Sequence, residues 1–366
     1  MASLKASLAL AVVASLATAG SASASVGQNR TDGPNYDRNP SVVQDGNATE
    51  VFFARSQQPC NRLAGCDADN SDYDLYVKKS TNGGRTYGPD QLVATNPDGP
   101  GPFRGRTIAA TRDGGGKVHV FWASGANSIP GLFHVQETNS GWSAPALVPG
   151  ALNVFNVEAL TRGNDVFLYT EECCGANGVY AYRYSGGAAV ARTLVSADKN
   201  LPKGIVEGRT VRLTYTDATA YPQVDVYVNE SNDGLTFGSE RLAVSEAGTS
   251  HWDPALAPRT FGYWGLFTAP DRQAGAGKQQ IAASVSRDFT NWSQPFEITP
   301  GEENGIEYWD YWPEPFVQGG NFSLFYTSAH STGTQPTGVG HIWSIGGPRG
   351  GGDRDWRRDW HDRDDD

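Results

Sequence analysis

The sequence predicts an all-β protein, a six-bladed β-propeller, and two observations lead to that class. The first is a repeated unit: apolar, β-rich runs recur six times, roughly fifty residues apart, and each is followed by an alternating strand. The second is composition, since the 366 residues include 44 Gly, 15 Tyr, 15 Phe and 10 Trp but only one Met. Small sheets repeated at this period are typical of propeller blades. A two-sheet sandwich is the competing architecture, but it has no reason to repeat one template six times.

Each repeat contains three recognisable strands and a weaker fourth. The strongest runs cover residues 51–53, 118–122, 166–169, 211–215, 264–267 and 322–326. The alternating strands that follow them cover 74–78, 131–136, 178–184, 224–228, 280–285 and 340–345. A shorter segment precedes each strong run and often opens with proline, as at 40–43, 254–256 and 315–317. We expect this segment to be the innermost strand of each blade.

The two ends of the chain differ from the repeats. A positive start at Lys5, an apolar run over 8–16 and the small residues Ala22-Ser23-Ala24 form the pattern of a signal peptide over residues 1–24. No later apolar stretch is long enough for a membrane span. We therefore expect a secreted protein whose propeller occupies residues 25–348. Residues 349–366 are glycine followed by dense Asp and Arg, which predicts a disordered, charged tail.

Charge and cysteine content exclude some classes of partner. The formal net charge is -11, so nucleic acid is not an expected partner. In an exported chain, four cysteines indicate disulfides, and we expect Cys60 to pair with Cys66. The adjacent Cys173 and Cys174 could form a strained vicinal bridge or remain as thiols. No C-x-x-C spacing supports a zinc site.

Three turn motifs connect the repeats to a known superfamily. Residues 80–87 read S-T-N-G-G-R-T-Y and resemble the Asp-box pattern S-x-D-x-G-x-T-W; residues 231–237 and 286–292 are shorter or looser copies. An Asp or Asn in such a turn accepts backbone N–H groups, and glycine supplies positive φ. The aromatic residue is expected to fold back on its hairpin.

The chain therefore resembles the sialidase-like superfamily of bacterial-neuraminidase-repeat propellers over about residues 35–346. The resemblance implies Asp-box hairpins on the outer rim, away from the active site. It does not fix the activity, because the superfamily includes sialidases, other glycoside hydrolases, polysaccharide lyases and lectin-like binders.

The candidate catalytic residues precede or open the innermost strands, which converge on one central funnel. Trp312-Pro313-Glu314-Pro315 and Trp252-Asp253-Pro254 resemble the acid-and-proline segments of propeller glycosidases. We predict Glu314 as general acid, Asp253 as base or nucleophile and Glu158 as a supporting carboxylate. Asp253 and Glu314 open adjacent repeats and are expected to form the acid pair. The alternative for Asp253 is a turn cap before proline.

Candidate substrate-binding residues lie at corresponding positions. Arg38-Asn39-Pro40 resembles the R-I-P motif whose arginine binds the substrate carboxylate in sialidases, although the middle residue differs. The alternative for Arg38 is a structural ion pair with Asp37. The complete predicted binding set is Arg38, Arg104, Arg106, His251, Trp309, Tyr311 and Trp312, in which the aromatic residues would line sugar subsites.

The strict sialidase pattern is not matched, because the arginine triad cannot be assembled. After residues 167–169, where an arginine should follow in the repeat with the catalytic glutamate, the chain has Thr170-Glu171-Glu172. The leading prediction is a glycoside hydrolase that acts on a glycan or polysaccharide without a cofactor. A non-catalytic carbohydrate-binding propeller and a polysaccharide lyase for uronic-acid glycans are the alternatives. The acidic stretch 66–74 leaves calcium open, with a polar disulfide-closed loop as its other explanation.

Overall fold

The protein is described from a computed structural model. The described residues are 28–31, 33–59, 73–95, 107–124, 131–173, 177–217, 219, 221, 223–260, 262–271, 279–299, 302–303, 306–318, 321–332 and 340–346. The predicted signal peptide and tail, Cys60, Cys66, Cys174, Arg104 and Arg106 lie outside these ranges, so the predictions made for them stay predictions. The described chain contains no helix that could cross a membrane.

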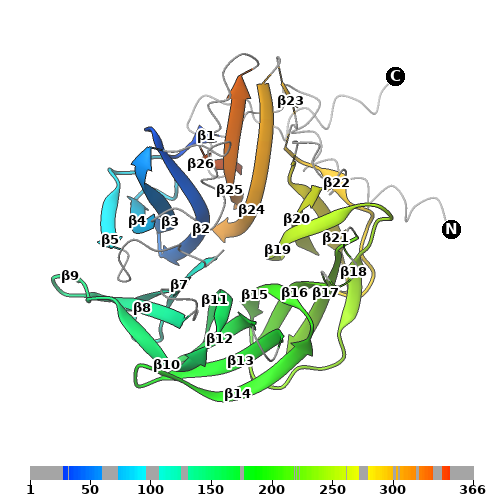
Figure 1. Cartoon of the computed structure of the whole chain (residues 1–366), viewed down its shortest axis with the longest axis horizontal. Helices are drawn as coiled ribbons and strands as arrows, with labels where there is room; N and C mark the ends of the chain where they lie inside the picture. Colours follow the sequence, from blue (N-terminus) through cyan, green and yellow to red (C-terminus); the bar gives the residue numbers. More distant parts are fainter. Residues whose placement is uncertain are drawn as a thin grey trace.

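Six antiparallel sheets are arranged around one axis (Figure 1). The first blade contains β2 (Asn35–Asp45), β3 (Ala48–Pro59), β4 (Tyr73–Ser80) and β5 (Gln91–Ala94). The second contains β6 (Ile108–Arg112), β7 (Val118–Ser124), β8 (Gly131–Thr138) and β10 (Ala146–Leu152), with the short β9 (Gly141–Trp142) beside β8. The third contains β11 (Val154–Arg162), β12 (Asp165–Glu172), β13 (Gly178–Ser185) and β14 (Ala188–Ala197).

The remaining three blades follow in chain order. The fourth contains β15 (Asn200–Glu207), β16 (Thr210–Asp217), β17 (Asp225–Ser231) and β18 (Arg241–Val244). The fifth contains β19 (Ser250–Thr260), β20 (Tyr263–Asp271), β21 (Ala282–Ser286) and β22 (Phe296–Glu297). The sixth contains β23 (Glu302–Glu303), β24 (Ile306–Gln318), β25 (Asn321–Thr332) and β26 (Gly340–Gly346). The predicted six-bladed, all-β class is confirmed.

The ring is closed by the N-terminal segment. Strand β1 (Gln28–Asn29) pairs with β26, so the outermost strand of the last blade comes from the start of the chain. Arg30 continues this contact, because its backbone N–H donates to the Ile342 carbonyl at 2.7 Å. The innermost strands β2, β6, β11, β15, β19 and β24 contact one another in ring order. This arrangement brings residues that are about fifty positions apart in the sequence to one central channel.

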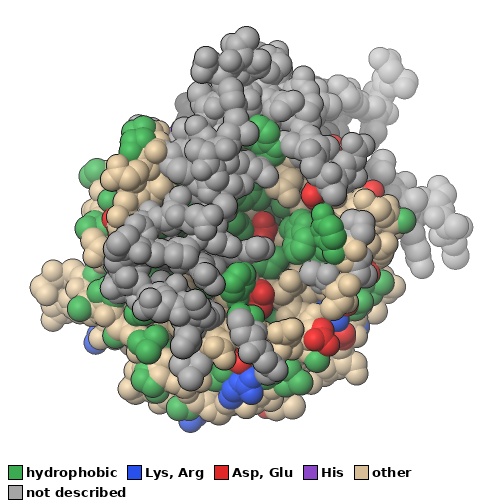
Figure 2. Space-filling model, viewed as in Figure 1, with side chains coloured by type: hydrophobic (Ala, Val, Ile, Leu, Met, Phe, Trp, Pro, Cys, Tyr) green, Lys and Arg blue, Asp and Glu red, His purple; other side chains and the backbone are tan. Residues whose placement is uncertain are grey.

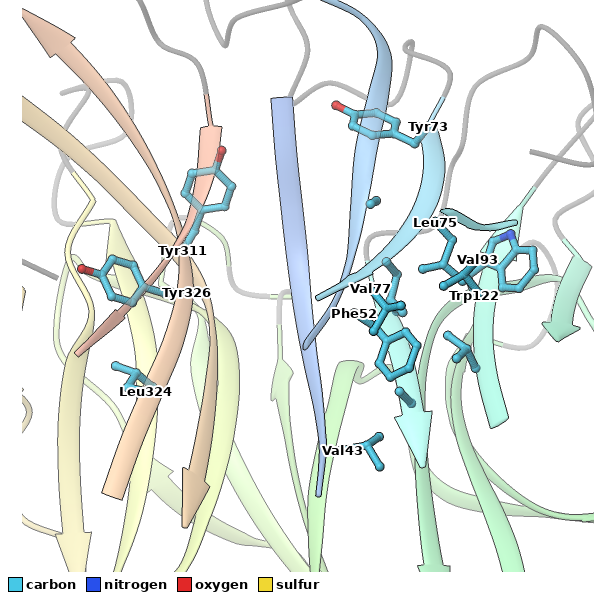
Figure 3. Close-up of a cluster of buried hydrophobic side chains, with 14 of the residues drawn as sticks. Val43, Phe52, Tyr73, Leu75, Val77, Val93, Trp122, Tyr311, Leu324 and Tyr326 are labelled. Carbon is cyan, nitrogen blue, oxygen red and sulfur yellow. The ribbon is translucent and has the colours of Figure 1, made fainter. Parts of the chain in front are cut away.

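Apolar side chains fill the space between neighbouring blades. Figure 3 shows one such cluster, in which Phe52 and Val77 of the first blade lie near Trp122 of the second, while Leu324 comes from the last blade. Phe52, Val77 and Leu324 are fully buried. Because successive strand residues point to opposite faces, each sheet can pack on both neighbours at once. Burial of these faces keeps the inner strands in register around the channel.

The three predicted turns join the third and fourth strands of their blades. In the first blade, the Ser80 hydroxyl accepts the Gly84 N–H at 2.8 Å, and the Asn82 side-chain oxygen accepts the Thr86 N–H at 3.0 Å. Asp233 and Asp288 accept backbone N–H groups in the equivalent turns. These bonds satisfy backbone groups that the strands leave unpaired.

The aromatic residue of these turns also contacts the preceding blade. Tyr87 packs edge-on against Phe325, with ring centres 6.4 Å apart, and Phe237 packs edge-on against Tyr169 at 5.8 Å. The turn motif therefore connects neighbouring blades as well as closing its own hairpin.

Candidate active site

A backbone bulge before proline recurs in four of the six inner strands. Asn39, Leu201, Asp253 and Trp312 each precede a proline and have φ values of 56°, 53°, 51° and 51°. Strand pairing shifts register at each of these positions. Left-handed backbone is costly for large side chains such as Leu and Trp, and it persists only where the surrounding structure enforces it.

The bulges determine which side chains reach the channel. A bulge re-aims the residues that follow it. Lys203 follows Pro202 in the fourth blade and Glu314 follows Pro313 in the sixth, so these two residues occupy equivalent positions. Glu158 lies in β11 of the third blade, without a preceding proline.

Lys203 joins Glu158 and Glu314 across the channel. Its ammonium nitrogen lies 3.1 Å from Oε2 of Glu158 and 3.1 Å from Oε2 of Glu314. The side chains are largely buried, with exposed fractions of 13% for Lys203, 9% for Glu158 and 18% for Glu314. The two carboxylate oxygens therefore lie no farther apart than twice 3.1 Å. The other oxygen of Glu314 accepts the Val42 N–H of the first blade at 3.4 Å.

Burial and mutual charge set the protonation of this group. Burial raises the pKa of Glu158 to about 7, and the charge of Glu314 adds to the rise while Lys203 opposes it. Burial disfavours the charge on Lys203, but the two glutamates outweigh it and raise the pKa of Lys203 above its usual value. Near neutral pH, the group holds a charged lysine and a Glu158 that is partly protonated.

A small cavity opens onto Lys203 between the bulges of three inner strands and the start of β6. Its lining residues are Asn39, Pro40, Thr107, Ile108, Lys203, Trp312 and Pro313. Figure 2 shows a hollow at the centre of the ring, with acidic side chains inside it and apolar side chains around it. The cavity thus combines a cation, an amide and an indole ring.

Arg38 lies beside this cavity and is fully buried. Its guanidinium carbon lies 4.1 Å from the centre of the Tyr73 ring and 5.5 Å from that of Trp312. Asp37, the alternative ion-pair partner, is held by Arg55 through bonds of 2.6 and 2.9 Å. Arg38 therefore packs between two aromatic residues that belong to the first and last blades.

Asp253 contacts the next blade through a backbone bond. Its Oδ2 accepts the Trp312 N–H at 3.4 Å, so the carboxylate supports the bulge that precedes Glu314. Asp253 thus accepts a backbone N–H, as a turn cap would, but the N–H belongs to a neighbouring strand and not to its own turn. The acids that the structure brings to one cation are Glu158 and Glu314, whereas Asp253 lies against the backbone of β24.

Three other predicted binding residues are buried. The side chain of His251 is fully buried, with Nδ1 at 3.2 Å from the Thr268 hydroxyl and Nε2 at 3.6 Å from Glu246. Trp309 and Tyr311 are 8% and 5% exposed and belong to the apolar cluster that extends from the last blade to its neighbours. Their roles toward substrate stay predictions, and Trp312 is the aromatic residue of the predicted set that lines the cavity.

The sequence places Lys203 among the residues that converge on the funnel, but it was assigned no role there, although a further signal for it was present. Leu201-Pro202-Lys203 matches the x-Pro-x pattern of Trp312-Pro313-Glu314. An alignment of the repeats on their prolines would have placed Lys203 opposite the predicted acids. Within the described chain, no cluster of His, Cys, Asp and Glu side chains is arranged to hold a metal ion. The calcium prediction for 66–74 rests mostly on residues outside the described ranges.

Asp310 is a buried acid of β24 that lies four residues before Glu314. It is 1% exposed, and burial raises its pKa to about 7, while hydrogen bonds from Ser328 and Thr299 oppose the rise. Since the unfolded carboxyl ionises near pH 4, stability should fall as pH rises from about 4 to 7. We expect Asp310→Asn to remove this loss. The free energy of unfolding of the variant should therefore rise relative to that of the wild type by up to about 1.4 kcal/mol per pH unit over that window.

Urea unfolding at pH 4, 6 and 8 measures this difference. Asp165→Asn, at an exposed aspartate at the start of β12, is the matched control and should show no such trend. A constant difference between Asp310→Asn and the wild type at all three pH values would contradict the raised pKa.

The comparisons with known proteins concern the fold. No protein-family model and no curated protein sequence matches the chain. The NanB sialidase from Streptococcus pneumoniae is similar in structure with a TM-score of 0.59 and 9% identity, over 87% of this chain and 70% of that one. A protein of unknown function from Dyadobacter fermentans has a TM-score of 0.58 and 14% identity, over 88% and 96%. An ulvan lyase bound to -[GlcA(1-4)Rha3S]- has a TM-score of 0.54 and 11% identity, over 87% and 85%.

These matches establish the fold alone: the chain shares its propeller architecture with the NanB sialidase and with the ulvan lyase. That architecture is shared by proteins with different carbohydrate chemistry, as the sialidase and the lyase illustrate. The residues in the channel must therefore carry the argument about function.

Proposed function

We propose that the protein is a secreted glycoside hydrolase whose two catalytic carboxyl groups are Glu158 and Glu314. The observation that carries this proposal is the Glu158–Lys203–Glu314 group, in which two glutamates from opposite blades meet one buried cation. Solved structures with this fold include a sialidase and a polysaccharide lyase, which supports a carbohydrate substrate. The first 24 residues would direct export, and the chemistry below uses side chains alone.

The raised pKa of Glu158 makes it the general acid in this proposal. Glu158 donates its proton to the glycosidic oxygen as the bond to the anomeric carbon breaks. Glu314 attacks that carbon as a carboxylate and forms a glycosyl ester. Glu158 then removes a proton from water, and the water releases the sugar from Glu314. The two Oε2 atoms that contact Lys203 lie no farther apart than twice 3.1 Å, which is compatible with the close spacing of retaining enzymes.

Lys203 is a positioning residue in this scheme. Its ammonium group holds one oxygen of each carboxyl in place, and burial favours the protonated form of Glu158. The two acids thus take different roles although they share one partner. Trp312 offers an apolar face for the sugar ring at the cavity wall. Arg38 lies beside the indole ring of Trp312.

A carbohydrate-binding propeller without catalysis is the second candidate. The observation that favours it is the same ion-pair group, because Lys203 occupies one oxygen of each glutamate. In that case the charges would fix the floor of a binding site, and Trp312 would carry most of the affinity.

A screen with matched variants separates the candidates. The wild-type protein is assayed on a panel of aryl glycosides and uronic-acid polysaccharides, and release of the aryl group is measured. We expect Glu314→Gln to lose turnover by at least about 100-fold while it keeps ligand affinity within about tenfold, because the contacts remain. Glu137→Gln, at a partly exposed glutamate of the second blade outside the cavity, is the control and should behave as wild type. Full activity of Glu314→Gln would remove that residue from the mechanism.

The same screen distinguishes the remaining classes. A lyase would form an unsaturated uronic acid, detected by its ultraviolet absorbance, and would leave aryl glycosides intact. A binder would show affinity for the panel with no turnover in any variant.

A further inference from the structure

Asn39 is a polar side chain enclosed in the wall of the cavity. It is 3% exposed and lines the cavity together with Lys203 and Trp312. Its backbone is fixed on both sides: the N–H donates to the Thr327 hydroxyl at 3.2 Å, and Pro40 follows directly. The residue also has a left-handed backbone with φ of 56°. The position of the side chain is therefore set by the bulge of β2.

The amide of Asn39 has unmet hydrogen-bonding capacity. Both its side-chain nitrogen and its side-chain oxygen are buried and have no hydrogen-bond partner among the described residues. Buried polar groups are nearly always paired, so an orphaned amide needs an explanation, and a ligand that supplies both partners is one. The equivalent bulge positions hold Leu201, Asp253 and Trp312, so a neutral donor and acceptor occurs only in the first of these four bulges.

We infer that Asn39 is a specificity-determining residue that binds two adjacent hydroxyl groups of a sugar ring packed on Trp312. This inference rests on the proposed carbohydrate function of the same cavity. A planar amide presents a donor and an acceptor side by side, and two vicinal hydroxyl groups can accept from one and donate to the other. The indole of Trp312 in the same cavity wall supplies the apolar surface against which the ring would lie.

A sugar that lacks one of the two hydroxyls leaves half of the amide unpaired. A buried site built to bond a hydroxyl discriminates strongly against the analogue without it. The expected signature of Asn39 is therefore a large affinity difference between a sugar and its deoxy analogue. A purely structural role of Asn39 would not produce this difference.

Asn39→Gly is the informative variant. Glycine removes the amide and adopts positive φ without strain, so the bulge should survive. Asn153→Gly is the matched control, because Asn153 also has a positive φ, of 63°, at the start of the third blade and does not line the cavity. Circular dichroism and thermal unfolding verify that both variants fold.

The probes are the methyl glycosides of glucose, galactose and mannose and their monodeoxy analogues at C-2, C-3 and C-4. Binding is measured by titration calorimetry or ligand-observed NMR on the full chain. We expect the wild type and Asn153→Gly to discriminate between one or more of the parent sugars and their analogues. Such a parent should bind at least tenfold more tightly than each of two analogues that lack one of a pair of neighbouring hydroxyls. Asn39→Gly should bind the parent and those analogues equally.

Two results would overturn the inference. The first is a wild type that binds no parent sugar or does not discriminate between a parent and its deoxy analogues. The second is unchanged discrimination in Asn39→Gly. If Asn39→Gly does not fold, Asn39→Leu replaces it, because Leu201 occupies the equivalent bulge with a φ of 53°, and this variant should also bind the parent sugar and both analogues equally. Absence of turnover with intact discrimination would contradict the proposed hydrolysis alone, so the two failures are distinguishable.

Discussion

Replacing Glu158 by glutamine is expected to lower kcat by about 100- to 10,000-fold on any aryl glycoside that the wild type hydrolyses. Glutamine keeps the size and one acceptor oxygen of Glu158 but cannot donate a proton to the glycosidic oxygen. The pH profile provides a second readout. Because the pKa of Glu158 is about 7, the protonated form is lost as pH rises through 7, and wild-type kcat/KM should decline above that value.

Asp253→Asn is the matched control for this prediction. Asparagine can still accept the Trp312 N–H through its side-chain oxygen, so the bulge of β24 should remain. Turnover within about tenfold of the wild type is expected if Asp253 acts on the backbone. A loss as large as that of Glu158→Gln would support the sequence-based prediction that Asp253 is the base or nucleophile.

The blades were predictable because each carries its own pattern. Alternating apolar residues, prolines and the Ser-x-Asp turns are local signals, and they recur with the period of the fold. Strand β1 was not predicted because Gln28–Asn29 is only two residues long and has no alternation to detect. Its partner β26 lies at the far end of the sequence, and only closure of the ring brings the two together.

The sequence predicted which acids lie near the channel but not which of them share a contact, and their catalytic roles stay predictions. Glu158, Glu314 and Asp253 were identified from their position at the innermost strands. The expected pairing of Asp253 with Glu314 assumed that adjacent blades supply the pair. In the structure, Glu158 and Glu314 come from the third and sixth blades, which face each other across the ring. The x-Pro-x segments mark the positions of the bulges in the sequence. Which acids Lys203 reaches also depends on its length and on the distances across the ring, and a repeat pattern encodes neither of these.

Lys203→Met is expected to cost about 3–5 kcal/mol of unfolding free energy, because it leaves two buried carboxylates without their shared cation. Methionine has nearly the length of lysine and no charge, so the packing of the stem is retained. The remaining glutamates repel each other, and their pKa values should rise. A carboxyl whose pKa is higher in the folded than in the unfolded protein stabilises the fold at low pH, and this contribution is lost as pH rises. The defect should therefore be small near pH 4 and largest near pH 8.

Chemical unfolding of three proteins across this pH range tests the argument. The triple variant Glu158→Gln, Lys203→Met, Glu314→Gln removes all three charges and should recover most of the lost stability, with little dependence on pH. If Lys203→Met is too unstable to purify, the triple variant alone tests the argument. It should fold if unpaired charge is the cause of the instability. A triple variant as unstable as Lys203→Met at every pH would show that the lysine stem supports the channel through packing, and Glu158 and Glu314 would then be independent of Lys203.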